Sequence, residues 1–253
     1  HNHTVNIPGV LSVPCDVLVK EEVQSVIYAF RPDITIYCAG ISSVLECAKR
    51  EDFADALNTS GLFNVAEYCQ RYKSQICYIS SGFVFGGESK NYLEMDIPDA
   101  ITVYGRTQAS AEFYIQKTSL NYLIFRCSRL YGRGINPNQM TWFEQLQNKL
   151  SEGQVSVMDD QVKLGFLDVT YLAMILRICI EKGVSNRLLQ VSSKDICTHF
   201  EFSKMYCKIF GAQEDLINRG KWPMPISSNS MASGMSSAGD KMSFKLDISN
   251  IEG

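Results

Sequence analysis

The sequence predicts an α/β protein with a Rossmann-like, doubly wound parallel sheet and a smaller C-terminal α/β substrate lobe. Short β-branched runs alternate with longer amphipathic stretches between Val17 and Val191, a pattern typical of βα units. Runs such as Tyr122–Phe125 are apolar throughout, as expected when helices cover both faces of a sheet. Right-handed crossovers between such strands produce a doubly wound sheet.

Strands are expected wherever a short run is rich in β-branched or aromatic residues. These runs are Ile34–Cys38, Ile76–Ser80, Tyr122–Ser128, Val155–Met158, Leu164–Val169 and Arg187–Ser192. Helices are expected in the longer stretches that repeat apolar residues at helical spacing. These stretches are Lys20–Phe30, Asp52–Tyr72, Tyr104–Thr118, Gln139–Ser151, Thr170–Lys182 and His199–Phe210.

Length and charge exclude several classes of protein. The 253 residues, 45% hydrophobic and 20% charged, are enough for one large domain or for a domain and a smaller lobe. Lys and Arg number 24 against 27 Asp and Glu, so nucleic acid is not expected as the main partner. The strongest apolar stretch, Ala173–Ile180, is short and contains Arg177, so we expect no membrane span.

The nine cysteines are dispersed without a Cys-x-x-Cys pair. This usage is typical of a reducing compartment and predicts a cytoplasmic protein. The histidines, His1, His3 and His199, do not fall at ligand spacing near a cysteine, so we expect no metal site.

Small and hydroxyl residues follow two of the expected strands. The turn Cys38-Ala39-Gly40 lets a planar cofactor approach the backbone at the end of a strand, although an ordinary strand-to-loop glycine would look the same. Ser80 and Ser81 end the next strand, where hydroxyls face the cleft at the carboxyl edge of the sheet. Turn-forming serines are the alternative interpretation.

Three segments follow one another along the chain in the order and spacing of a known family: Arg31–Gly40, Tyr78–Gly87 and Thr102–Glu112. Together they resemble the extended short-chain dehydrogenase/reductase superfamily, most closely its branch of dTDP-4-dehydrorhamnose reductases and related nucleotide-sugar reductases and epimerases. The resemblance covers roughly Cys15–Phe210. It implies an oxidoreductase that uses NADP or NAD on a nucleotide-linked keto-sugar. It does not separate the two cofactors, because the residue that selects between them follows a strand that is not recognisable here.

The resemblance also implies roles for single residues. Ser81 takes the catalytic Ser/Thr position and orients the substrate oxygen, and Tyr104 donates the proton. Ser80 and the turn Cys38-Ala39-Gly40 lie beside the cofactor. Asp16 faces the adenine, although an Asp before a helix is usually a cap.

One residue departs from the family pattern. Gln108 stands where the family's Tyr-x-x-x-Lys has lysine, on the same helix face as Tyr104. The lysine holds the ribose hydroxyls and supplies the charge that lowers the pKa of the tyrosine. Gln108 can hydrogen-bond ribose but carries no charge. Arg106 and Lys117 are the candidates to replace it, but Arg106 points to a different helix face.

The family's glycine-rich turn, Gly-x-x-Gly-x-x-Gly, is the second departure. It holds the cofactor pyrophosphate, and residues 1–16 contain only Gly9. By resemblance, about one βαβ unit would precede His1. We therefore expect either part of a longer polypeptide or a remnant without the usual pyrophosphate site. The first is favoured, because a sheet without its central strand would aggregate.

Substrate contacts are expected beyond the third strand of the sheet. Arg129 and Arg133 suit a nucleotide diphosphate, with solvated loop arginines as the alternative. Asn136 suits a sugar hydroxyl or a helix cap. Gly82 replaces an Asp found in many relatives, so a substrate contact is expected to be missing.

We expect residues 1–128 to form the dinucleotide-binding domain and residues 129–253 mainly the substrate lobe, with segments of residues 155–191 returning to the main sheet. The segment Ser227–Gly239 is rich in Ser, Gly and Met and shows no periodicity, so we expect a loop there. An alternative to the reductase remains, a catalytically silent nucleotide-binding regulatory or scaffold subunit, because relatives include a regulatory subunit of methionine adenosyltransferase. A homodimer or a regulatory partner protein is the protein partner that the resemblance allows.

Overall fold

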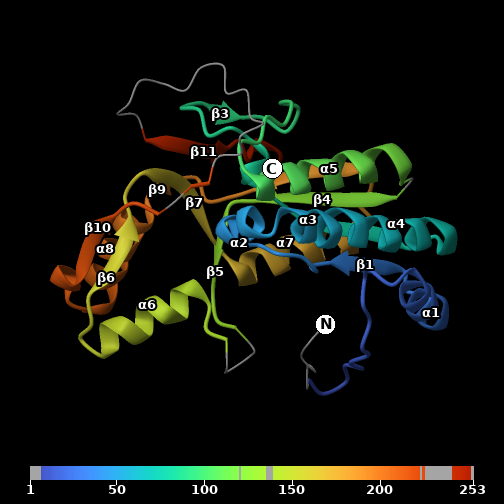
Figure 1. The fold of residues 1–253 in the computed structure, drawn as a ribbon, viewed down its shortest axis with the longest axis horizontal. Coiled ribbons are helices and arrows are strands. Elements are labelled where there is room, and N and C mark those ends of the chain that lie inside the picture. Colours follow the sequence, from blue (N-terminus) through green and yellow to red (C-terminus); the bar gives the residue numbers. More distant parts are fainter. Residues whose placement is uncertain (1–6, 120, 135–138, 223, 226–240, 252–253) are drawn as a thin grey trace.

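The main sheet has four parallel strands in the order β1-β2-β4-β8. The computed structural model describes residues 7–119, 121–134, 139–222, 224–225 and 241–251. The strands are β1 (Ile34–Tyr37), β2 (Gln75–Ser81), β4 (Tyr122–Cys127) and β8 (Arg187–Val191), and every pair is parallel. Figure 1 shows the sheet between layers of helices. The predicted α/β fold with a parallel sheet is confirmed.

Each face of this sheet carries its own apolar core. On one face, alternate residues such as Tyr78 and Ile124 pack against α1 (Lys20–Phe30), α4 (Gly61–Tyr72) and α5 (Val103–Thr118). On the other face, the intervening residues pack against α7 (Val169–Glu181). Apolar residues at successive positions of a strand are therefore required, because both faces of the sheet are covered.

The stretch predicted as one helix over Asp52–Tyr72 is divided. It consists of α3 (Glu51–Asp55), a π-helical turn, η1 (Ala56–Ser60), and α4. A short helix that we did not predict, α2 (Val44–Lys49), precedes them and is capped by the Ser43 side chain. A helix of six residues is too short for a periodic signal.

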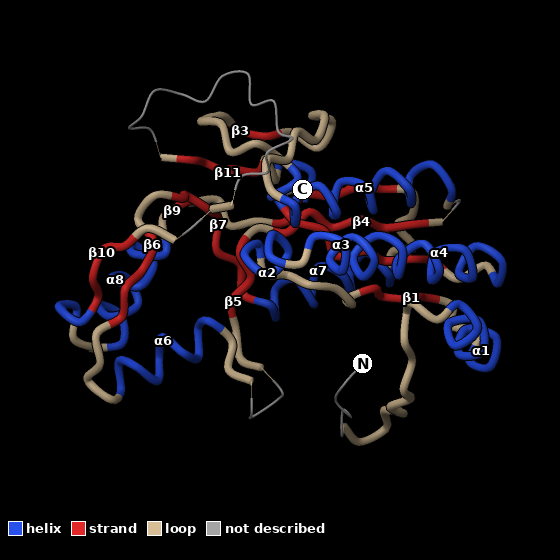
Figure 2. Tube along the Cα trace, viewed as in Figure 1, coloured by secondary structure: helices blue, strands red, loops and turns tan. Residues whose placement is uncertain are grey.

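A second group of strands forms the smaller lobe (Figure 2). Its larger sheet has the order β3-β11-β7-β5, with β9 antiparallel to β7, and its smaller sheet pairs β6 with β10. The strands are β3 (Asn91–Tyr92), β5 (Arg129–Tyr131), β6 (Ser156–Asp159), β7 (Val162–Asp168), β9 (Ile196–Cys197), β10 (Ile217–Gly220) and β11 (Met242–Leu246). The helices are α6 (Trp142–Ser151) and α8 (His199–Phe210), with the 3₁₀ turns η2 (Gly82–Val84), η3 (Glu214–Leu216) and η4 (Ser249–Ile251).

The expected return of some segments of residues 155–191 to the main sheet applies to α7 and β8. The strands β6 and β7 pair within the lobe instead. The boundary at residue 128 stays a prediction.

Local signals explain where α6 begins. We predicted a helix from Gln139, whereas α6 begins at Trp142. The Thr141 hydroxyl accepts from the Glu144 amide, and the Glu144 carboxylate accepts from the Thr141 amide, which is a capping box. The predicted loop Ser227–Gly239 lies outside the described residues. Within the described part of the chain, the helices are too short or too polar to cross a bilayer.

Candidate functional site

Several of the predicted residues meet at the carboxyl edge of the main sheet. Cys38-Ala39-Gly40 follow β1 and are exposed, Ser81 ends β2, and Cys127 ends β4 opposite Ser81. Tyr104 lies in the first turn of α5. The Ser81 hydroxyl lies near enough to the Tyr104 phenol to lower the pKa of that phenol. This edge is where parallel α/β sheets bind ligands.

A close backbone contact places Tyr104 beside Ser81. A Cβ at Gly105 would lie 1.9 Å from the carbonyl oxygen of Phe83, so only glycine lets α5 approach η2 this closely. The Ser81 side chain accepts from the Phe83 amide at 3.2 Å and caps η2. The serine and the tyrosine are therefore held by the same turn.

The Tyr104 phenol stays protonated over the physiological pH range. Burial raises its pKa to about 12, while the Ser81 hydrogen bond and the charge of Arg129 act in the opposite direction. Desolvation disfavours the phenolate. The side chain is therefore a proton donor in its resting form.

Gln108 is oriented by a residue to which the sequence analysis gave no role. The Tyr78 hydroxyl donates to Gln108 Oε1 at 2.7 Å, and Gln108 Nε2 lies 3.4 Å from the Tyr104 hydroxyl. Tyr78 and Gln108 are both buried. The chain Tyr78–Gln108–Tyr104 thus aims the amide N–H at the phenol. In the sequence, Tyr78 resembles an ordinary core residue of β2, so only its contact across 30 residues reveals it.

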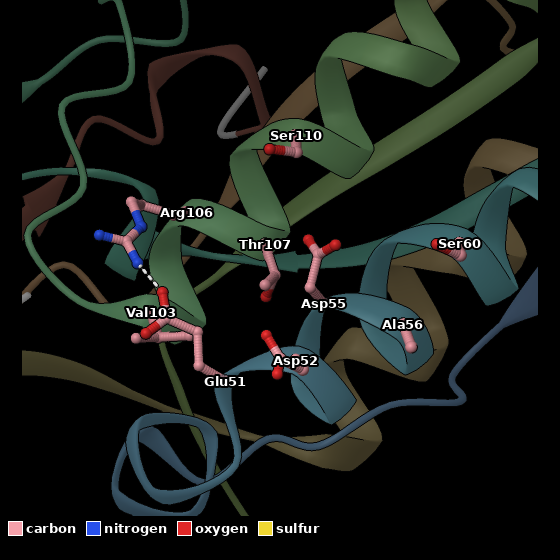
Figure 3. Close-up of a pocket in the computed structure, with 9 residues that line it drawn as sticks. All are labelled: Glu51, Asp52, Asp55, Ala56, Ser60, Val103, Arg106, Thr107 and Ser110. Atoms are coloured by element: carbon pink, nitrogen blue, oxygen red, sulfur yellow. Dashed lines mark hydrogen bonds and ion pairs between the residues drawn. The ribbon is translucent and has the colours of Figure 1, made fainter. Parts of the chain in front are cut away.

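Neither proposed replacement for the lysine reaches Tyr104. Arg106 is ion-paired with Glu51 at 2.5 Å and lines a hollow of about 580 Å³ between α3 and α5, as Figure 3 shows. Lys117 lies over the Phe113 ring near the end of α5. Both therefore belong to other surfaces of the molecule.

The turn after β1 is tied to α5 by Asn58. Its side chain accepts from the Ile41 amide at 2.7 Å and donates to the Ile41 carbonyl and to Thr107 Oγ1. Gly40 has φ +147°, and a Cβ there would lie 2.7 Å from Asn58 Oδ1. Glycine is required at this position for both reasons. These contacts give Asn58 a structural role.

Ser80 has a structural partner, whereas we predicted a cofactor contact. Its hydroxyl donates to Glu112 at 2.5 Å. Glu112 also pairs with Arg126 through bonds of 2.8 to 3.1 Å, with both side chains almost completely buried. The Arg126 guanidinium bonds to the Glu94 carbonyl as well. This ion pair fixes α5 against β4 and was not predicted from the sequence.

The remaining predicted residues lie elsewhere. Asp16 is exposed and accepts from the Leu18 amide at 2.9 Å, so it forms a turn before α1. It does not cap that helix, whose N-cap residue is Val19. Gly82 is buried against Leu246. Arg133 is exposed, and Asn136 lies outside the described residues.

Arg129 begins β5 and is half-buried. Its Nε is buried without a hydrogen-bond partner, and its guanidinium lies over the Trp142 ring at 5.2 Å. The Trp142 indole N–H donates to the Leu130 carbonyl at 2.9 Å, which fixes the ring under the guanidinium.

The model of the RmlD substrate-binding domain matches residues 2–238. The chain belongs to the RmlD substrate-binding domain family. The predicted resemblance to dTDP-4-dehydrorhamnose reductases is thereby confirmed.

The relatives of this RmlD-family chain include a protein named as a reductase and a subunit of methionine adenosyltransferase. It is 26% identical to the Haloferax volcanii protein named "Probable low-salt glycan biosynthesis reductase Agl14", over 94% of the chain and 77% of that protein. It is 29% identical to methionine adenosyltransferase 2 subunit beta of Rattus norvegicus, over 58% of the chain but only 40% of that protein. The chain thus spans well under half of the second relative.

A solved structure shows the same fold. The dTDP-4-dehydrorhamnose reductase of Bacillus anthracis, in complex with NADP, superimposes with a TM-score of 0.75 at 25% identity. The match covers 82% of this RmlD-family chain and 72% of the reductase.

Proposed function

We propose that this chain is an NAD(P)-dependent oxidoreductase that reduces a nucleotide-linked keto-sugar in the manner of dTDP-4-dehydrorhamnose reductases. The observation that carries the proposal is the meeting of Ser81 and Tyr104 at the carboxyl edge of the main sheet. The reductase and its NADP complex among the structural relatives support it.

The residues present fit the nicotinamide and ribose end of a dinucleotide. The turn Cys38-Ala39-Gly40 is exposed, and a glycine carries no side chain to block the backbone, so a flat ligand can approach it from the solvent side. Gln108 and Tyr104 lie across the same edge, within reach of ribose hydroxyls by the family pattern. The chain contains no Gly-x-x-Gly-x-x-Gly turn for the pyrophosphate. The nicotinamide, when bound, supplies the hydride.

The side chains of this site divide the remaining work. The Ser81 hydroxyl orients the sugar oxygen, and Tyr104 gives that oxygen a proton. Because burial raises the pKa of Tyr104 to about 12, the proton is present before the reaction begins. The Gln108 amide, held by Tyr78, donates to the phenol oxygen and keeps it in place. A neutral amide stabilises the phenolate that remains after proton transfer less than an ammonium would.

A second candidate function is a catalytically silent subunit that keeps the fold and binds a nucleotide. Gln108 favours it, because the position of the family's lysine carries no charge. The relationship to methionine adenosyltransferase 2 subunit beta also supports it. A regulatory partner protein, or a second copy of the chain, would then be the functional ligand.

Calorimetry and turnover separate the two functions. The full polypeptide is titrated with NADPH and NADH, and reduction of a dTDP-4-keto sugar is then measured for wild type, Tyr104→Phe and Gln108→Lys. The reductase requires cofactor binding and turnover that Tyr104→Phe abolishes. Cofactor binding without turnover in all three proteins would support the silent subunit.

We also propose that the protein works in the cytoplasm. All nine cysteines are free thiols in the structure, and most are buried. A chain with this many unpaired thiols suits a reducing compartment.

A further inference from the structure

Arg129 is a half-buried cation at the candidate site, and among the described residues it has no carboxylate partner. It follows Cys127 by two residues, and Cys127 is in register with Ser81, so the start of β5 lies at the same sheet edge as the serine. Its Nε is buried and makes no hydrogen bond. Within the described part of the chain, no carboxylate forms an ion pair with it.

Burying the Arg129 guanidinium costs solvation free energy unless a negative charge compensates it. A buried donor without a partner loses its solvation, and arginine remains charged because its guanidinium is a very strong base. Burial lowers the pKa of Arg129, which is the sign of a charge lacking solvent. A negative charge that forms beside it would relieve the cost.

The groups that face Arg129 narrow the choice of that negative charge. They are the neutral Tyr104 phenol, with which it interacts electrostatically, the Trp142 ring, and His199. Burial and the charge of Arg129 lower the pKa of His199 to about 3, so this histidine is neutral at physiological pH. Tyr104 is the group among them that becomes an anion when it gives up its proton.

We propose that Arg129 supplies the positive charge that a lysine at position 108 would otherwise supply, and that it stabilises the Tyr104 phenolate formed during reduction. The O–H bond of Tyr104 breaks as an O–H bond forms on the sugar oxygen, while the sugar carbon receives its hydride from the reduced nicotinamide. The phenolate then regains a proton from water. This inference rests on the proposed function, with Arg129 as a positioning charge that acts through Tyr104.

Gln108 and Arg129 thus divide what one lysine would do. The amide, anchored by Tyr78 at 2.7 Å, holds the phenol oxygen by a hydrogen bond. The guanidinium, which lies over the Trp142 ring, provides the charge. Arg106 and Lys117 are not available for this role, since they face Glu51 and Phe113.

The pKa of Tyr104 itself provides a test that needs no turnover. A fluorinated tyrosine, whose phenol is more acidic, is incorporated at position 104 of the full polypeptide, and its ionisation is followed by fluorine NMR. In Arg129→Gln the pKa of this phenol should rise by about one unit or more. Arg133→Gln is the matched control, because Arg133 is an exposed arginine of the same segment, and it should leave the pKa unchanged.

Two further variants keep the test decisive. Adding Gln108→Lys to Arg129→Gln should lower the phenol pKa again. If Arg129→Gln does not fold, Arg129→Lys is used instead, and its displaced charge should still raise the pKa. An unchanged pKa in a folded Arg129 variant would overturn the inference, whether or not the protein turns over.

Kinetics distinguish this role from a contact with the substrate diphosphate. If the protein is a reductase, Arg129→Gln should lower kcat about tenfold or more, the counterpart of one pKa unit, with little change in the KM for the sugar nucleotide. A raised KM with unchanged kcat would instead identify Arg129 as a diphosphate contact and contradict the inference. Absence of turnover in wild type would refute the proposed function alone, because the NMR result stands by itself.

Discussion

The buried histidine His199 should make the protein unstable in mild acid. Its side chain is 3% exposed, and both ring nitrogens lack hydrogen-bond partners. The rings of Trp222, Phe166 and Trp142 surround it, with centroids 4.2, 4.9 and 5.1 Å away. Burial, and secondarily the charge of Arg129, lowers its pKa from 6.5 to about 3.

The direction of the effect follows from proton linkage. Between pH 6.5 and about 3 the unfolded chain binds a proton at this histidine, whereas the folded protein does not. The contribution of His199 is therefore fully present above pH 6.5 and is lost as the pH falls towards the pKa of the folded state. A fall from pH 6.5 to pH 5, which is about 1.5 pH units, should therefore lower the free energy of unfolding by about 2 kcal/mol.

Urea unfolding followed by tryptophan fluorescence measures this loss. Wild type and His199→Leu are unfolded at pH 7 and at pH 5, and the two changes in the free energy of unfolding are subtracted. Carboxylates titrate equally in both proteins, so they cancel. We expect wild type to lose about 2 kcal/mol more than the variant. An equal loss in the two proteins would refute the assignment of a neutral, buried histidine.

Two other substitutions test how the site is held. Glu112→Gln should lower the free energy of unfolding in urea by about 3–5 kcal/mol, because it leaves Arg126 buried without its partner; a loss below about 1 kcal/mol would mean that solvent reaches the pair. Gly40→Ala should lower the melting temperature more than Gly153→Ala. Both glycines have positive φ, but only at Gly40 would the added Cβ meet Asn58. Equal shifts of the melting temperature in the two variants would show that the Asn58 side chain moves aside at little cost.

The central strands and helices of the fold could be predicted from the sequence because their patterns are long and local. The expected strand Ile76–Ser80 became β2 (Gln75–Ser81), and the expected helix Tyr104–Thr118 became α5 (Val103–Thr118). β11 could not be predicted, because it is a short strand whose partners β7 and β3 lie far away in the chain. Pairing, and not local propensity, determines such strands.

The site likewise contains residues that local sequence reveals and residues whose roles depend on distant contacts. Ser81 and Tyr104 were singled out because the short segments around them resemble the family's motifs in their usual order. The role of Tyr78 depends on Gln108, 30 residues away, and the isolation of Arg129 depends on everything that packs around it. A residue list cannot show that an arginine lacks a carboxylate, because the missing partner is a property of three-dimensional packing.

Transfer of hydrogen from the cofactor to a sugar is the most direct test of the proposed reductase. The full polypeptide is incubated with NADPH deuterated at the transferring position and with a dTDP-4-keto sugar, and the sugar product is analysed by mass spectrometry. We predict that wild type places deuterium on the sugar carbon and that Tyr104→Phe, with cofactor binding retained, does not. A wild-type protein that binds the cofactor but leaves the sugar unlabelled would contradict the account and identify the chain as a silent nucleotide-binding subunit.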